Sequence, residues 1–146
     1  GCQCGAVRYR VATRPLTFYA CHCTDCQRQS GSAFGLSLIV AAAGMATEGP
    51  FASFPFAGES GRPQRRTFCA ACGTRLWHQH LGADRRSLKA GTLDERGWLR
   101  PVAHIWADSR QPWVVLPEDA QVVPRAPDME ALIAAFAARL APRAPS

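Results

Sequence analysis

The sequence predicts an all-β fold that ends in one α-helix. Short segments with strand-like apolar patterning recur along the chain, and turn residues separate them at short intervals. The one long helical periodicity is confined to residues 128–140. A length of 146 residues is typical of a single domain. An apolar fraction of 47% is ordinary for a folded protein and argues against a disordered chain.

The expected strands follow one another through most of the chain. The first is predicted at residues 6–11, where apolar side chains alternate with arginines. Residues 36–40 form a short apolar run that is typical of a buried strand. Prolines and glycines crowd residues 49–64, which are therefore expected to be mostly loop with one short strand. Further short strands are predicted at residues 65–68, 74–79, 87–93 and 113–116.

Two helical segments are expected. The longer one, at about residues 128–140, places Met129, Leu132 and Phe136 at spacings of three and four residues, which indicates one buried face. Asp128 is placed to cap the start of this helix. A shorter helical turn is predicted after Cys23.

Charge and hydropathy narrow the classes of function. The chain carries 17 basic and 11 acidic residues, for a net charge of +6, and Lys89 is its one lysine. Because no block of five like charges occurs, a solvated basic surface is favoured over the steering of an anionic small molecule or a nucleic acid. No apolar run is long enough to span a membrane. The first residues show no secretory signal, so a cytoplasmic location with reduced thiols is expected.

Seven cysteines fall in three clusters whose spacings are typical of metal ligands. Cys2 and Cys4 lie two residues apart, so both thiolates face the same side of an extended chain. Cys69 and Cys72 enclose two residues, and Gly73 after them permits the tight turn that aims both sulfurs at one ion. The remaining cluster consists of Cys21, Cys23 and Cys26.

The number of cysteines suggests how these clusters are shared between ions. The first and last clusters together supply four thiolates, which is a closed structural zinc site, while the middle cluster supplies three, as in a catalytic zinc site with an open position. Thiolates favour zinc over hard ions, and an iron–sulfur cluster is the alternative for the four-cysteine set. Spacing alone also allows Cys69 and Cys72 to join two cysteines of the middle cluster in a structural site. His22 is discounted as a ligand, because on an extended stretch it points away from the cysteines beside it.

An open zinc site with three thiolates favours thiol chemistry over hydrolysis. Three thiolates and Zn²⁺ sum to a net charge of −1, which makes the ion a poor Lewis acid. Such a site is suited to a fourth thiolate that stays deprotonated and nucleophilic. A thiol substrate that attacks a small electrophile fits this description.

Three segments carry a specific combination of motifs: residues 1–9 (GCQCGAVRY), 21–34 (CHCTDCQRQSGSAF) and 68–77 (FCAACGTRLW). Together they resemble the glutathione-dependent formaldehyde-activating enzyme family, which is also related to centromere protein V. The later stretches KAGTLD, HIW and RQPW are similar to the same family. The resemblance covers about residues 1–120.

The resemblance implies several coiled antiparallel β-sheets around zinc-knuckle loops in a domain of residues 1–120. Residues 121–146 then form a C-terminal extension that carries the helix. It also implies condensation of glutathione, or another thiol, with formaldehyde or a small aldehyde to S-hydroxymethylglutathione, a carbon–sulfur lyase type of reaction. Two zinc ions per chain are implied, a structural one on Cys2, Cys4, Cys69 and Cys72 and a catalytic-type one on Cys21, Cys23 and Cys26.

Other residues have two readings. Arg28 and Ser32 follow the three-cysteine cluster and are candidate substrate-binding residues, although a loop that shapes the zinc turn also explains them. His104 is typical of a packed strand residue rather than an acid–base group. Two other classes of function stay open, a non-catalytic zinc-stabilised binding module and a metal-free redox protein. The tryptophans are expected in the core: Trp77, Trp98, Trp106 and Trp113.

Overall fold

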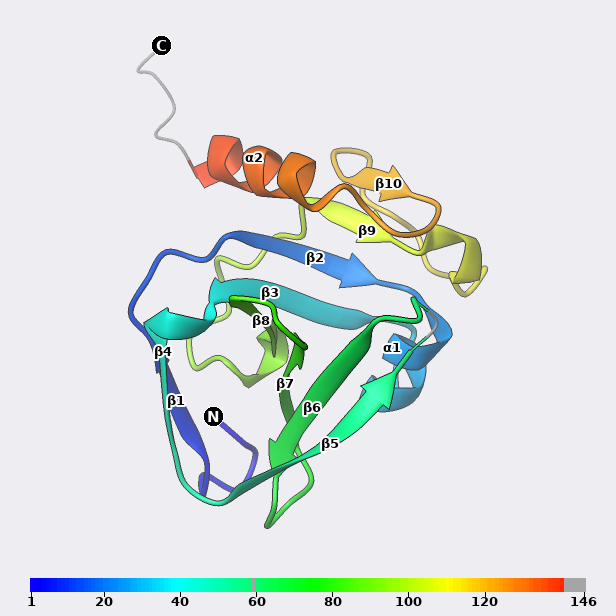
Figure 1. Ribbon diagram of the computed structural model, residues 1–146. Coiled ribbons are helices and arrows are strands. Elements are labelled where there is room, and N and C mark those ends of the chain that lie inside the picture. The colour runs from blue at the N-terminus through cyan, green and yellow to red at the C-terminus, as the bar shows by residue number, and fades with distance from the viewer. Residues whose placement is uncertain (59, 141–146) are drawn as a thin grey trace.

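A computed structural model describes residues 1–58 and 60–140 and confirms a mostly β fold with a C-terminal helix. Within these residues, ten strands form two sheets (Figure 1). The strands are β1 (Arg8–Val11), β2 (Thr17–Cys21), β3 (Gly35–Ala41), β4 (Met45–Glu48), β5 (Phe51–Ala57), β6 (Pro63–Cys69), β7 (Arg75–His80), β8 (Arg85–Lys89), β9 (Ala103–Ile105) and β10 (Gln121–Val123). The helices are α1 (Thr24–Ser30) and α2 (Met129–Leu140), with short 3₁₀ turns at Ala42–Gly44, Ala90–Thr92 and Ala107–Ser109.

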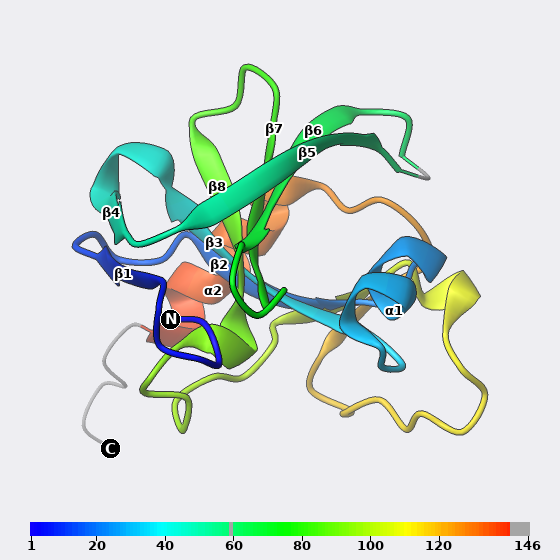
Figure 2. The same ribbon diagram turned by 90° about the horizontal axis from the view of Figure 1, so that it is seen from below.

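The larger sheet has the order β10-β9-β2-β3-β8-β7-β6-β5, while β1 and β4 pair by themselves. Neighbours from β2 to β5 in this order are antiparallel, whereas β9 runs parallel to β2 and β10 runs parallel to β9. The strand direction changes steadily from β2 and β3 to β5 and β6, so the sheet curls strongly (Figures 1 and 2). As a result, α1 lies between the start of β3 and the tip of β5 (Figure 1).

Neighbouring elements shield both faces of β2. On one face, Phe18, Leu38 and Leu88 stand opposite one another on β2, β3 and β8, and all three are fully buried. On the other face, the Thr17 hydroxyl donates a hydrogen bond to the Leu132 carbonyl of α2 at 2.9 Å. The two faces are therefore both shielded, which is why β2 is buried along its whole length.

The expected helix at the C-terminal end is confirmed as α2. Leu132 and Phe136 are buried at helical spacing, as the apolar pattern predicts. The Asp128 carboxylate accepts hydrogen bonds from the backbone N–H groups of Glu130 and Ala131, and so caps the helix. The shorter turn expected after Cys23 is also present, as the seven-residue helix α1.

Two expectations about strands are wrong. Residues 49–64 were expected to be mostly loop, yet seven of them form β5 and the stretch also holds the start of β6. Pro55 is tolerated there because β5 is the edge strand of the sheet and needs no N–H bond on its outer side. Residues 113–116 were expected to be a strand and form none, since Pro112 and Pro117 enclose them and Val114 bonds back to Gln111 in a turn.

The tryptophans divide equally between core and surface. Trp77 is buried and Trp106 packs against the core, as expected. Trp98 and Trp113 are 44% and 73% exposed, so the expectation of a core position is wrong for both. Both lie in turn or loop segments after β8, where few neighbouring elements can cover a large ring.

The described part of the C-terminal extension packs on the sheet. Strand β10 pairs with β9, and α2 contacts β2. The boundary at residue 120 stays a prediction. Across residues 1–58 and 60–140, none of the helices has the length and apolar character needed to traverse a lipid bilayer.

Candidate metal centres

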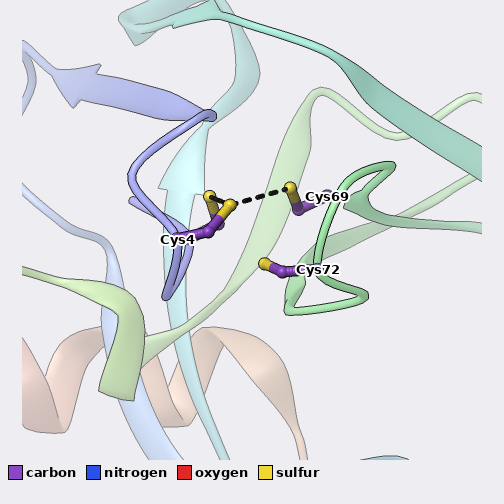
Figure 3. A group of neighbouring side chains, drawn as sticks. Cys4, Cys69 and Cys72 are labelled. Atoms are coloured by element: carbon purple, nitrogen blue, oxygen red, sulfur yellow. Dashed lines mark hydrogen bonds between the residues drawn. The ribbon is translucent and has the colours of Figure 1, made fainter.

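Cys2, Cys4, Cys69 and Cys72, here called the four-cysteine set, gather their sulfur atoms within 4.8 Å of one another. Figure 3 shows Cys4 facing Cys69 and Cys72 across the gap between the N-terminal segment and the turn that joins β6 to β7. The Sγ–Sγ distances are 3.5 Å for Cys2 and Cys4 and 3.8 Å for Cys4 and Cys69. A tetrahedral zinc ion with bonds of about 2.3 Å separates its sulfur ligands by about 3.8 Å, so these side chains fit the ion.

Local backbone and side-chain contacts aim the sulfurs of this set. Gly73 adopts a φ of 74°, and its N–H donates to the Cys69 carbonyl at 2.9 Å, which closes the turn between the two cysteines. The Thr74 hydroxyl, 3.1 Å from the Cys72 sulfur, lowers the pKa of Cys72 to about 5. The Gln3 N–H donates to the same hydroxyl and joins the two halves of the set. These contacts favour the thiolate form that binds metal.

Cys21, Cys23 and Cys26, here called the three-cysteine set, also have sulfurs within 4.8 Å of one another. Cys21 ends β2, Cys23 is the N-cap of α1, and Cys26 lies in the first turn of that helix. The Cys23 sulfur accepts a hydrogen bond from the Cys26 N–H at 3.4 Å, so the helix start itself brings the second and third sulfurs together. All three side chains are buried.

The coupled pKa values of the three-cysteine set favour a bound cation. Contacts with Cys21 and Cys23 lower the pKa of Cys26 to about 2, while the contacts with Cys23 and Cys26 raise the pKa of Cys21. The ionisation of these sulfurs is therefore strongly linked, and a positive ion among them would favour the thiolate form of all three. A set of three buried thiols fits a soft divalent cation such as zinc.

Polar neighbours fix the position of the three-cysteine set. The Gln29 amide donates to the Cys26 sulfur at 3.3 Å. Gln27 donates to the backbone carbonyls of His22 and Ser109 at 2.7 Å and 2.8 Å, which ties α1 to the turn after β9. The His22 ring lies 2.9 Å from a ring nitrogen of His104 and outside both cysteine groups, in agreement with its exclusion as a ligand. His104 is a buried residue of β9, as expected.

A cavity of about 450 Å³ adjoins the three-cysteine set, and all three cysteines line it. Its wall also includes Tyr19 and Ser37 from the sheet. A second cavity of about 500 Å³ lies beside it, and Gln29 lines both. Of the four-cysteine set, Cys72 alone is among the described residues that line either cavity. All members of the three-cysteine set thus adjoin a cavity, against one member of the four-cysteine set.

Arg28 and Ser32, the predicted substrate-binding residues, are exposed on α1 and just after it. The Ser32 N–H donates to the Gln27 carbonyl at 3.3 Å and so helps to end α1. Neither residue is among the described residues that line the two cavities. Their contact with a substrate stays a prediction.

Sequence reasoning missed the polar residues that surround the three-cysteine set. Gln29, Arg66 and His78 line the first cavity, and Arg75 and Lys89 line the second. A signal was present in β6 and β7, which carry consecutive polar residues at 64–67 and 78–80. The sequence could not predict which sulfurs these side chains would face, because that depends on the pairing of distant strands.

Comparisons with known proteins place these centres in context. A sequence model described as glutathione-dependent formaldehyde-activating enzyme matches residues 1–109. A protein of Halomonas elongata named "Putative glutathione-dependent formaldehyde-activating enzyme" is 31% identical over 81 residues, which are 52% of each chain. The match thus spans about half the length of that curated relative. A crystal structure of a Rhodobacter sphaeroides protein covers 64% of this chain and 84% of its own, with a TM-score of 0.50 and 19% identity, and supports the fold alone.

Proposed function

The chain belongs to the glutathione-dependent formaldehyde-activating enzyme family, and from this membership we propose that it condenses glutathione, or another thiol, with formaldehyde or a small aldehyde. The product with formaldehyde is S-hydroxymethylglutathione, and the reaction is of the carbon–sulfur lyase type. The observation that carries the proposal is the gathering of three buried sulfurs at the wall of a cavity of about 450 Å³.

The two cysteine sets would hold two zinc ions with different roles. The four-cysteine set would hold a closed structural ion. The three-cysteine set would hold an ion with one position left for a ligand from the cavity. When bound there, zinc stabilises the negative charge of a substrate thiolate while leaving its sulfur nucleophilic.

The chain's own residues orient the reactants and supply the proton. The first cavity admits the thiol and the aldehyde next to Cys21, Cys23 and Cys26. The substrate sulfur forms a bond to the carbonyl carbon, the carbonyl π bond breaks, and the oxygen takes up a proton. The hydroxyls of Tyr19 and Ser37 line the cavity and are the candidates to donate that proton. Gln29 keeps the Cys26 sulfur in place through its 3.3 Å hydrogen bond.

The test is the rate at which the adduct forms and dissociates. Exchange NMR spectroscopy of glutathione and formaldehyde at neutral pH measures this rate with and without the protein. We expect acceleration by the wild-type chain and none by Cys26→Ser. An unchanged rate with the zinc-loaded wild-type chain would contradict the proposal.

A further inference from the structure

Basic side chains occupy the sheet face that carries the three-cysteine set. Tyr19 and Cys21 share one face of β2, and Tyr19 stands opposite Ser37, which in turn stands opposite Lys89. Two residues back along β8, Ser87 lies opposite His78, and His78 lies opposite Arg66. Lys89, His78 and Arg66 therefore point to the side of the sheet on which Cys21 lies.

A β-bulge adds a further cation to this face. The register of β6 and β7 shifts between Thr67 and Phe68, which places Arg75 opposite Phe68. The Arg75 guanidinium carbon lies 5.5 Å from the ring centre of Phe54, the residue opposite Arg66. Arg75 thus joins Arg66 on the same side of the sheet.

Several nitrogen atoms of these residues are buried and lack a hydrogen-bond partner among the described residues. They include Nε and Nη2 of Arg75 and Nζ of Lys89. Desolvation lowers the pKa of Arg75 to about 10 and that of Lys89 to about 8, so both are mainly charged at neutral pH. A buried cation without a partner is costly, and a bound anion removes that cost.

Arg75 and Lys89 both line the second cavity. They line it together with Gln29 and Phe34, its described lining residues include no carboxylate, and Cys72 of the four-cysteine set also lies in its wall. The first cavity differs, because Asp25 lies there near Arg66. The second cavity therefore offers two unpartnered cations to an anion without a competing carboxylate.

Hydrogen bonds to the sulfurs do not satisfy these nitrogen atoms. Among the described residues, the cysteines of both sets included, none is a hydrogen-bond partner of Nε and Nη2 of Arg75 or of Nζ of Lys89. Gln29 lines both cavities: its amide nitrogen donates to Cys26, and its Oε1 atom, which can only accept, is buried without a partner among the described residues.

We propose that Arg75 and Lys89 bind a carboxylate of the thiol substrate in the second cavity while the substrate thiol reaches the three-cysteine set. This inference rests on the proposed function and deepens it. The site selects thiols that carry a carboxylate over neutral or cationic thiols of the same size. Arg75 and Lys89 are then residues that determine specificity.

The first test needs no variant. S-methylglutathione keeps both carboxylates but has no free thiol, and its diethyl ester has neither carboxylate. Calorimetric titration of the zinc-loaded wild-type protein compares the two ligands. We expect the acid to bind at least about tenfold more tightly, because charge-assisted hydrogen bonds are lost with the ester. Equal affinities would overturn the inference.

The second test assigns the residues. Lys89→Gln and Arg75→Gln should each weaken binding of the acid and leave binding of the ester unchanged, whereas Lys89→Arg should keep the preference for the acid. Arg14→Gln, which removes a positive charge from an exposed loop outside both cavities, is the matched control. If Lys89→Gln does not fold, Arg75→Gln decides the point. A retained preference in Arg75→Gln would overturn the assignment.

Three further outcomes separate this inference from a site for free anions and from the proposed function. Binding of acetate without binding of S-methylglutathione would indicate a site for free small anions and overturn the inference. Tight binding of S-methylglutathione without acceleration of adduct formation would support the carboxylate site and contradict the proposed function. Acceleration together with equal binding of acid and ester would support the proposed function and contradict the carboxylate site.

Discussion

The two cysteine sets use the same ligand atom at very different distances along the chain. The four-cysteine set joins residues 65 positions apart, Cys4 and Cys69, while the three-cysteine set lies within a single strand–helix junction. Two members of the first set, Cys4 and Cys72, are exposed, whereas all of the second are buried beside a cavity. We therefore propose that ligands far apart in sequence hold the fold together, while clustered ligands depend on the fold and leave room for a substrate.

The largest effect is expected from Cys69→Ser. Cys69 is fully buried, and its loss opens the link between the N-terminal segment and the turn after β6. We expect a loss of more than about 3 kcal/mol in the free energy of unfolding, because the metal no longer closes this long loop. Thermal unfolding followed by circular dichroism, with zinc content per chain, measures it. A midpoint close to that of the wild type would contradict a structural role.

Cys26→Ser should affect catalysis more than stability, the opposite of Cys69→Ser. It removes one of the three sulfurs of the three-cysteine set but breaks no long-range link. We expect catalysis of adduct formation to fall by more than about 100-fold, and the midpoint of thermal unfolding to fall less than in Cys69→Ser. If Cys26→Ser proves the less stable of the two variants, the division of roles is wrong.

Metal removal should proceed in two stages. A three-ligand site holds its ion less tightly than a four-ligand site, so increasing chelator should first take one zinc equivalent and the activity with it. The second equivalent should leave only when the fold is lost. Zinc analysis and near-ultraviolet circular dichroism on the same samples follow both stages. Loss of activity and fold at one chelator concentration would speak against two distinct sites.

A smaller effect is expected from Gln29→Leu. This change removes the 3.3 Å hydrogen bond to the Cys26 sulfur and keeps the side chain's size. Zinc affinity of the three-cysteine set should fall by about tenfold, with no change at the four-cysteine set. Competition with a fluorescent chelator measures both affinities. Gln121→Leu on exposed β10 is the control, and equal behaviour of the two variants would refute the role of Gln29.

The smallest effect concerns the surface pair of Arg8 and Asp94, which anchors the strand after the first cysteines. The Arg8 guanidinium lowers the pKa of Asp94, so the pair stabilises the fold above the usual carboxyl pKa of 3.8 and stops doing so as pH falls through the lowered value. Asp94→Asn should therefore unfold at a slightly lower temperature at pH 7, and the difference should vanish in acid. A difference that grows in acid would contradict this sign.

The metal sites were the most predictable part of the molecule. Paired cysteines with a glycine after them encode their own turns, as Cys69, Cys72 and Gly73 do. Spacing did not decide which clusters meet, because that depends on where the N-terminal segment lies in space. The resemblance to a family resolved the grouping, and the gathered sulfurs agree with it.

The errors have a common physical origin in strand context. Pro55 reads as a loop signal, yet an edge strand accepts it. The apolar run at residues 113–116 reads as a strand, yet no neighbour pairs with it among the described residues. The basic face could not be foreseen because a register shift, which no local pattern encodes, turns Arg75 toward it.

Cadmium-113 NMR of the metal-substituted protein tests the contrast between the two sets most directly. Each cadmium ion reports on its own sulfur ligands. We predict two resonances, of which one shifts when glutathione is added while the other stays in place. A single resonance, or two that both shift or both ignore glutathione, would contradict a closed set beside an open one.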